Sequence, residues 1–220
     1  MKLYGFFRSG TSHRLRIALN HKGLTCEQTA VDLRKEEHLG EAYRAINPQQ
    51  LVPALEVEGG VMVQSPAIIE WLEERYPHPS LLPPHPRERA TVRAMAAVVG
   101  CDIHPVNNRR ILEALRHRFG ANEGAVNDWC ATWIGAGFDA FDDMVNAHGL
   151  KGSFAFGANV TVADVYLVPQ IESARRFKVD PGPMATSAGD RRGVQRRGEA
   201  CTRAGSEMPQ RPPLAARASP

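Results

Sequence analysis

The sequence lacks the patterns that mark metal-binding, disulfide-rich, secreted or membrane-spanning proteins. Its four cysteines, Cys26, Cys101, Cys130 and Cys201, are scattered without a CxxC pair. This scatter indicates neither a structural zinc site nor a disulfide framework, so we expect no metal. No apolar run approaches the roughly 18 residues that span a bilayer, and the opening MKLYGFF lacks the long apolar region of a signal peptide. We therefore expect a protein of the reducing cytoplasm with no membrane partner.

An excess of positive charge over the main body of the chain is also missing. The formal net charge of the 220 residues is +3, but residues 181–220 hold seven Arg against three acidic residues. That local charge of +4 leaves −1 for residues 1–180. A nucleic-acid partner is therefore not expected, because such proteins present a basic surface to phosphate. The hydrophobic share of 43% and the charged share of 23% are ordinary for a globular protein with a packed core.

The first 76 residues predict a small α/β domain. An apolar run at 3–7 precedes a helical pattern that ends near Gly23, and 27–31 and 41–45 predict a second strand and a short helix. The runs 54–57 and 61–63 flank Glu58-Gly59-Gly60, which suits an antiparallel hairpin. Ser65-Pro66 then offers a helix start before an apolar stripe that reaches Tyr76. The predicted order is βαβαββα.

A proline-rich segment separates this domain from a helical one. The run PHPSLLPPHP contains five prolines, which remove backbone donors and fix φ, so we predict domain boundaries of 1–78, a linker of 79–86 and an all-helical domain of 87–180. Helical spacing continues from Arg87 to about Arg118 and again from Asn122 to His148. Thr161-Val162-Ala163-Asp164 has the pattern of a capping box, which predicts a further helix.

The character of the sequence changes after Asp180. Residues 181–220 contain six Pro and five Gly, no aromatic residue and few large apolar ones. Such a composition cannot bury enough apolar surface to offset chain entropy, so we predict a disordered tail. Enrichment in Arg, Gly, Pro and Ala without periodicity is typical of an out-of-frame reading of GC-rich DNA. Our hypothesis is a frameshift near codon 180, natural or a sequencing error.

Four strings carry a resemblance to a known family. They are FFRSGTSHRLRIAL, NPQQLVPALEVEGGVMVQSPAIIEWLEERYP, CDIHPVNNRRILEAL and VPQIESARRFKVD. Together they resemble the zeta class of the glutathione transferases over about residues 1–180. The resemblance implies a thioredoxin-like βαβαββα domain followed by an all-α domain, with glutathione as the cofactor. It also implies a homodimer.

The resemblance implies a set of glutathione-binding residues. In this family the proline after Val52 is cis, so that the Val52 backbone pairs with the cysteinyl part of glutathione like an added strand. Gln64 and Ser65 stand at a helix N-terminus, where free amides favour the γ-glutamyl carboxylate, although plain helix capping by Ser65 has the same sequence pattern. The other positions that match glutathione contacts are Ser9, Gly10, Thr11, His38, Gln49, Gln50, Pro53, His104 and Asn108. His104 and Asn108 are one helical turn apart in the sequence, which would place them on one face of a helix.

The implied reaction is a cis–trans isomerisation of maleylpyruvate to fumarylpyruvate in aromatic-acid breakdown. A thiolate adds to the conjugated double bond, the bond rotates, and the thiolate leaves. Hydroxyl donors and a helix N-terminus both favour a thiolate. The zeta pattern has Ser-Ser-Cys where this chain has Ser9-Gly10-Thr11, so no protein thiol takes part and either Ser9 or Thr11 contacts the sulfur.

Arginines are the candidates for holding the other partner, a small dicarboxylate keto acid. Their planar guanidinium groups suit carboxylates. By resemblance, Arg8 and Arg176 face the substrate, with Arg109 or Arg110 as a third candidate. Two alternatives stay open: maleylacetoacetate isomerase, because both substrates carry a maleyl group, and a non-catalytic or impaired glutathione-binding module, because the C-terminus is altered.

Overall fold

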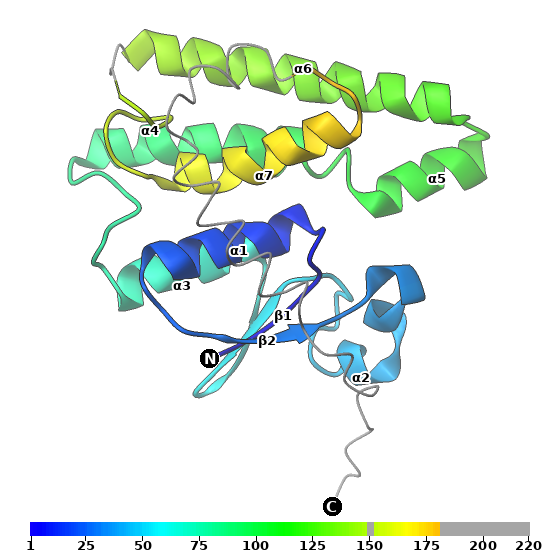
Figure 1. The fold of residues 1–220 in the computed structure, drawn as a ribbon, viewed down its shortest axis with the longest axis horizontal. Helices are drawn as coiled ribbons and strands as arrows, with labels where there is room; N and C mark the ends of the chain where they lie inside the picture. The colour runs from blue at the N-terminus through cyan, green and yellow to red at the C-terminus, as the bar shows by residue number, and fades with distance from the viewer. Residues whose placement is uncertain (149–151, 181–220) are drawn as a thin grey trace, which may run out of the picture. The chain divides into compact units, whose positions relative to one another are not determined.

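The computed structural model describes residues 1–148 and 152–180 (Figure 1). It divides between Pro79 and Ser80 into two compact units, and each is described by itself below. The tail at 181–220, for which we predicted disorder and a frameshift, lies outside the described residues.

The first unit is built on a mixed four-stranded sheet in the order β2-β1-β3-β4. Strand β1 (Lys2–Gly5) pairs parallel with β2 (Glu27–Ala30) and antiparallel with β3 (Ala54–Val57), and β3 pairs antiparallel with β4 (Gly60–Val63). The hairpin turn needs glycine, because Gly59 and Gly60 have φ of 95° and 139°. The predicted βαβαββα order is confirmed.

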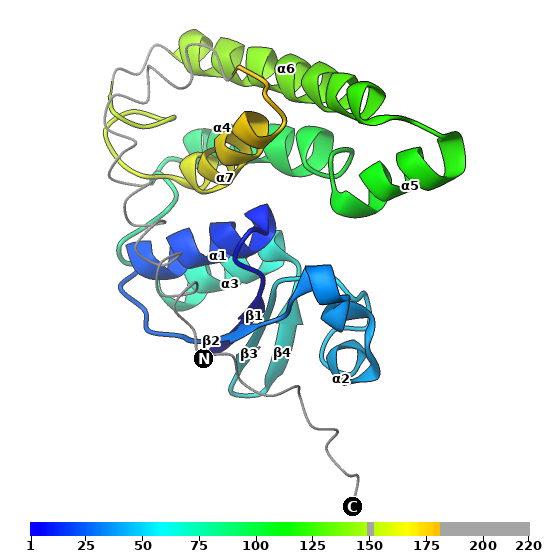
Figure 2. The same cartoon turned by 45° about the vertical axis from the view of Figure 1, so that its right-hand side comes forward.

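Helices cover both faces of this sheet. Helices α1 (Gly10–His21) and α3 (Ser65–Arg75) lie side by side on one face (Figure 2). The short helix α2 (Glu41–Arg44) serves the other face, where its fully buried Tyr43 packs in one cluster with Tyr4 and Ala54. Neighbouring residues of a strand point to opposite faces, so Leu3 and Tyr4 of β1 supply the two halves of the core. Two 3₁₀ turns, η1 (Leu33–Lys35) and η2 (Glu37–Leu39), precede α2.

The described part of the second unit is helical, as predicted. It contains α4 (Pro86–Ala97), α5 (Arg109–Phe119), α6 (Glu123–His148) and α7 (Val162–Arg176). Helix α7 is buried along most of its length and packs against α4 and α6. Its capping box is confirmed: the Asp164 carboxylate accepts the Thr161 N–H at 2.9 Å and also the Ala155 N–H at 2.8 Å.

The range from Arg87 to about Arg118, where the sequence has helical spacing, does not form one continuous helix. Helix α4 ends at Ala97, a π-helical turn η3 spans Val98–Ile103, and α5 begins only at Arg109. Glycine is required within this turn, because a Cβ at Gly100 would lie 2.8 Å from the Tyr166 ring. His104 keeps helical backbone, with φ −60° and ψ −43°, but Pro105 after it has no backbone N–H with which to continue the helical hydrogen bonds. The Asn108 side chain caps α5 by accepting the Arg110 N–H at 3.2 Å.

Two kinds of feature are absent from residues 1–148 and 152–180. None of the helices there is long and apolar enough to cross a membrane. Within the same residues no group of three or more His, Cys, Asp and Glu side chains has the geometry to hold a metal ion.

Candidate active site

The Ser9 hydroxyl lies at the N-terminus of α1. Ser9 is the N-cap residue, with extended backbone at φ −75° and ψ 122°, and its Oγ accepts the Ser12 N–H at 3.2 Å. The Ser12 hydroxyl in turn accepts the Phe6 N–H at 3.3 Å, which ties the end of β1 to the first turn of the helix. A hydroxyl at this position sits in the positive end of the helix dipole.

Thr11 joins this helix start to a distant loop. Its Oγ1 donates to the Val52 carbonyl at 2.9 Å and lies 2.9 Å from Ser9 Oγ. The Val52–Pro53 peptide bond is cis, as the family resemblance implies. Both candidate hydroxyls therefore lie beside the residue that is expected to pair with glutathione.

The loop that leads to the cis proline is also held by two residues that the sequence did not single out. The Tyr43 hydroxyl and the Asn47 side-chain amide both donate to the Leu51 carbonyl, at 2.8 Å and 2.6 Å. Burial raises the pKa of Tyr43 to about 12, so the phenol is a neutral donor at physiological pH. The sequence carried a signal for neither role, since both depend on the fold of 43–51.

The start of α3 holds an unused buried hydroxyl. Ser65 is 2% exposed, and its Oγ makes no hydrogen bond to the described residues. The expectation that Ser65 caps the helix is wrong: Gln64 is the N-cap, with φ 69° and without a side-chain capping bond. A buried hydroxyl beside free helix amides is suited to an anionic or polar group of a ligand.

Hydrogen bonds tie the segments that contain His38, Gln49 and Gln50 to other parts of the first unit. The Gln50 side-chain amide donates to the carbonyl of Leu39, the neighbour of His38 in η2, at 2.8 Å. Gln64 Nε2 donates to Gln49 Oε1 at 2.5 Å, which links this segment to the start of α3. Within this unit, hydrogen bonds thus join Thr11 to Val52 and Gln64 to Gln49.

The remaining predicted residues are arginines and two polar residues near α5. Arg8 is exposed in the turn before Ser9, and Arg176 is exposed at the end of α7. Arg109 and Arg110 are exposed in the first turn of α5, where Arg109 lies 4.0 Å from Glu113. The prediction that His104 and Asn108 share a helix face is wrong, because His104 ends the π-helical turn and Asn108 precedes α5 with extended backbone.

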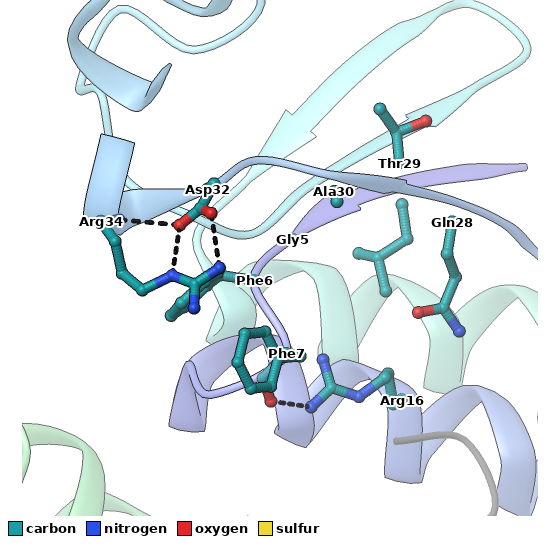
Figure 3. A pocket seen from close by; sticks show the side chains of 10 residues that line it. Gly5, Phe6, Phe7, Arg16, Gln28, Thr29, Ala30, Asp32 and Arg34 are labelled. Atoms are coloured by element: carbon teal, nitrogen blue, oxygen red, sulfur yellow. Dashed lines mark hydrogen bonds and ion pairs between the residues drawn. The ribbon is translucent and has the colours of Figure 1, made fainter. Parts of the chain in front are cut away.

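A small hollow beside β1 and β2 contains none of the predicted residues (Figure 3). Two interactions engage charged groups of its lining: Asp32 and Arg34 form an ion pair at 2.7 Å, and Arg16 Nη2 donates to the Phe7 carbonyl at 3.0 Å. The hydrogen bond from Arg34 lowers the pKa of Asp32 to about 2.

Comparison with known proteins decides the family. The model for the glutathione S-transferase N-terminal domain matches residues 3–80. The chain is 63% identical to a maleylpyruvate isomerase of a Ralstonia species over 183 residues, which is 83% of this chain and 86% of that protein. It belongs to the zeta class of the glutathione transferases.

Other members support this assignment. This zeta-class transferase is 48% identical over 182 residues to the maleylacetoacetate isomerase of Pseudomonas aeruginosa, covering 81% of this chain and 84% of that one. A holo structure of maleylpyruvate isomerase, a bacterial zeta-class enzyme, matches with a TM-score of 0.87 at 59% identity over 90% of this chain and 96% of that one. The maleylacetoacetate isomerase of Methylobacterium extorquens AM1, with bound malonate and glutathione, matches with a TM-score of 0.86 at 30% identity over 96% and 100%.

Proposed function

We propose that this zeta-class transferase is a glutathione-dependent cis–trans isomerase that converts maleylpyruvate to fumarylpyruvate. The observation that carries the proposal is its 63% identity to a maleylpyruvate isomerase, together with a hydroxyl pair at the N-terminus of α1. The 48% identity to a maleylacetoacetate isomerase makes maleylacetoacetate the second candidate substrate.

The first unit contains hydrogen-bonding groups that suit the parts of glutathione. The buried Ser65 hydroxyl and the free amides at the start of α3 suit the γ-glutamyl carboxylate. The Val52 backbone, before the cis proline, suits the cysteinyl part of the peptide. The proposed set also includes Gln64, Gln49, Gln50 and His38.

Bound glutathione supplies a thiolate that adds reversibly to the conjugated double bond and so allows it to rotate. The protein must hold this sulfur ionised. We propose that Ser9 or Thr11 donates a hydrogen bond to it, while the N-terminal amides of α1 add the positive end of a helix dipole. Gly10 adds no side chain beside that position.

Arginines would hold the two carboxylates of the substrate. We propose Arg8 and Arg176 for this role, with Arg109 or Arg110 as a third group and His104 and Asn108 as polar neighbours. A guanidinium group can bind a carboxylate through two parallel hydrogen bonds, which fixes its orientation as well as its charge.

The test is a spectrophotometric assay of the purified chain with maleylpyruvate and with maleylacetoacetate, each with and without glutathione. Turnover that requires glutathione and is faster with maleylpyruvate supports the proposal. Faster turnover of maleylacetoacetate supports the second candidate. Retention on glutathione resin without turnover of either substrate would overturn both and leave a binding module.

Two further parts of the proposal concern the protein in the cell. We propose that the protein is a homodimer, as the family resemblance implies, and that it lies in the cytoplasm. Light scattering after gel filtration measures the first, and fractionation of the source cells measures the second.

A further inference from the structure

We propose that Tyr43 and Asn47 are positioning residues that orient the peptide group between Leu51 and Val52, and thereby aim the Val52 N–H at glutathione. This inference rests on the proposed function and deepens it, because it extends the glutathione site to two residues behind the loop. Tyr43 and Asn47 are 0% and 1% exposed, so they act through the backbone rather than on the ligand directly.

The Leu51 carbonyl is held by two buried donors. The Tyr43 hydroxyl donates to it at 2.8 Å and the Asn47 side-chain amide at 2.6 Å. A carbonyl oxygen has two lone pairs, so these two bonds use its full capacity to accept. The Tyr43 ring is itself fixed, because it packs in the cluster with Tyr4 and Ala54. The Leu51 oxygen is therefore directed at the core of the first unit.

The direction of this oxygen decides the direction of the Val52 N–H. The two groups belong to one planar peptide unit, and the bond between Leu51 and Val52 is trans, so they point in opposite directions. With the oxygen turned to the core, the N–H points away from it. This N–H donates to no residue within 1–148 and 152–180, and Val52 is half-buried. It is thus a donor whose direction is set before a ligand arrives.

Asn47 also fixes the first part of the same loop. Its Oδ1 accepts the Gln49 N–H at 3.0 Å, and its backbone carbonyl accepts the Gln50 N–H at 2.8 Å. The Gln49 side chain in turn accepts from Gln64 at 2.5 Å. One side chain therefore holds both Gln49 and the Leu51 carbonyl, so the loss of Asn47 should disturb more of the proposed site than the loss of the Tyr43 hydroxyl.

Tyr43→Phe is the central variant, because it keeps the buried ring and removes only the hydroxyl. The matched control is Tyr4→Phe. Tyr4 lies edge-on to Tyr43 in the same cluster, with ring centroids 6.5 Å apart, but its hydroxyl donates to Glu56 at 2.6 Å and not to the loop. Asn47→Ala removes both side-chain bonds of Asn47.

Three measurements are needed for each variant. Circular dichroism establishes that it is folded, and calorimetry measures its affinity for glutathione. Heteronuclear NMR of the ligand-free protein measures the chemical shift of the Val52 amide, which reports the orientation of the peptide group without any ligand.

We expect Tyr43→Phe to weaken glutathione binding about 2- to 12-fold, since the most that a misdirected Val52 N–H can lose is one ordinary hydrogen bond. Asn47→Ala should weaken it further, because Gln49 is released as well. The Val52 amide resonance should shift in both variants. Tyr4→Phe should change neither the affinity nor this resonance, although it also removes a hydroxyl from the cluster.

Two results would overturn the inference. One is a Tyr43→Phe variant with wild-type affinity for glutathione. The other is a loss of affinity in Tyr4→Phe as large as that in Tyr43→Phe, which would show a general effect of core packing. Wild-type protein that does not bind glutathione would instead refute the proposed function, and the Val52 amide of the ligand-free variants would still test the orientation of the peptide group.

Discussion

Lys22 and Glu73 form a buried ion pair at 2.8 Å between the end of α1 and the last turns of α3. Their side chains are 0% and 7% exposed. The Lys22 ammonium also donates to the carbonyls of Tyr76 and Pro79, at 2.6 Å and 3.1 Å. All three protons of one ammonium group are therefore used inside the first unit.

Replacing Lys22 should destabilise the first unit strongly. Lys22→Met would leave the Glu73 carboxylate buried without its partner, which costs about 3–5 kcal/mol in other proteins. The matched control is Lys2→Met, because Lys2 lies 3.9 Å from Glu27 in a pair whose side chains are 33% and 61% exposed. The control should cost about 1 kcal/mol or less. Urea unfolding followed by circular dichroism measures the stability of both variants. Equal losses of stability in Lys22→Met and Lys2→Met would contradict a stabilising role of the buried pair.

Ser65→Ala should weaken glutathione binding without weakening the fold. The hydroxyl is buried and makes no hydrogen bond to the described residues, so its removal costs no internal bond. The loss of one bond to the ligand predicts about 2- to 12-fold weaker binding in calorimetry.

Ser80→Ala is the control for this prediction. Ser80 Oγ donates to the Leu82 carbonyl at 2.7 Å and accepts the Leu82 N–H at 3.0 Å, so its removal should lower the urea midpoint and leave glutathione affinity unchanged. If Ser65→Ala lowers stability and leaves affinity intact, the hydroxyl has a structural role only.

The sequence predicted the first unit well because its signals are local. The hairpin has glycines at the two positions with positive φ, and the apolar stripe of α3 has the period of a helix. The break between α4 and α5 was missed, although Pro105, which lacks a backbone N–H, and Asn108, a typical N-cap residue, signalled it. The π-helical turn itself was not predictable, because it involves the close approach of Gly100 to Tyr166, 66 positions later in the sequence.

In the candidate site, too, some features could be predicted from the sequence and others could not. Ser9, Thr11 and Val52 were found through family strings, but only the three-dimensional arrangement gives the direction of the hydrogen bond from Thr11 to Val52. Tyr43 and Asn47 were missed, although both donate to the Leu51 carbonyl. A buried tyrosine in a short helix gives the same sequence pattern whether it only packs in the core or also donates such a hydrogen bond.

Stability should depend on Tyr43 at high pH. Burial raises the pKa of this phenol from 10.0 to about 12, so the folded state favours its neutral form. The contribution is complete below pH 10 and is lost as the pH rises toward 12. Between pH 8 and pH 11 the wild-type urea midpoint should therefore fall more than that of Tyr43→Phe. Parallel curves for the two proteins would contradict the raised pKa.

Cys130 should resist thiol reagents. Burial raises its pKa to about 11, against a smaller opposing effect of Arg116. At pH 8 the thiolate fraction is then on the order of one in a thousand. Cys101 is exposed and Cys26 partly exposed. Brief treatment with a maleimide, followed by peptide mass spectrometry, should find the label on Cys101 and Cys26 and not on Cys130. Label on Cys130 at the same rate would show that its helix opens readily.

Arg176→Met should raise the Michaelis constant for maleylpyruvate. Loss of a charge-assisted hydrogen bond to a carboxylate is worth about 1.5–3 kcal/mol, which corresponds to roughly 10- to 150-fold in kcat/KM. Arg175→Met is the matched control, since Arg175 is the exposed neighbour in the last turn of α7 and should change kcat/KM little. Arg8→Met tests the second carboxylate in the same way. Affinity for S-methylglutathione should be unchanged in all three variants. Turnover by Arg176→Met with a wild-type Michaelis constant would remove Arg176 from the substrate site.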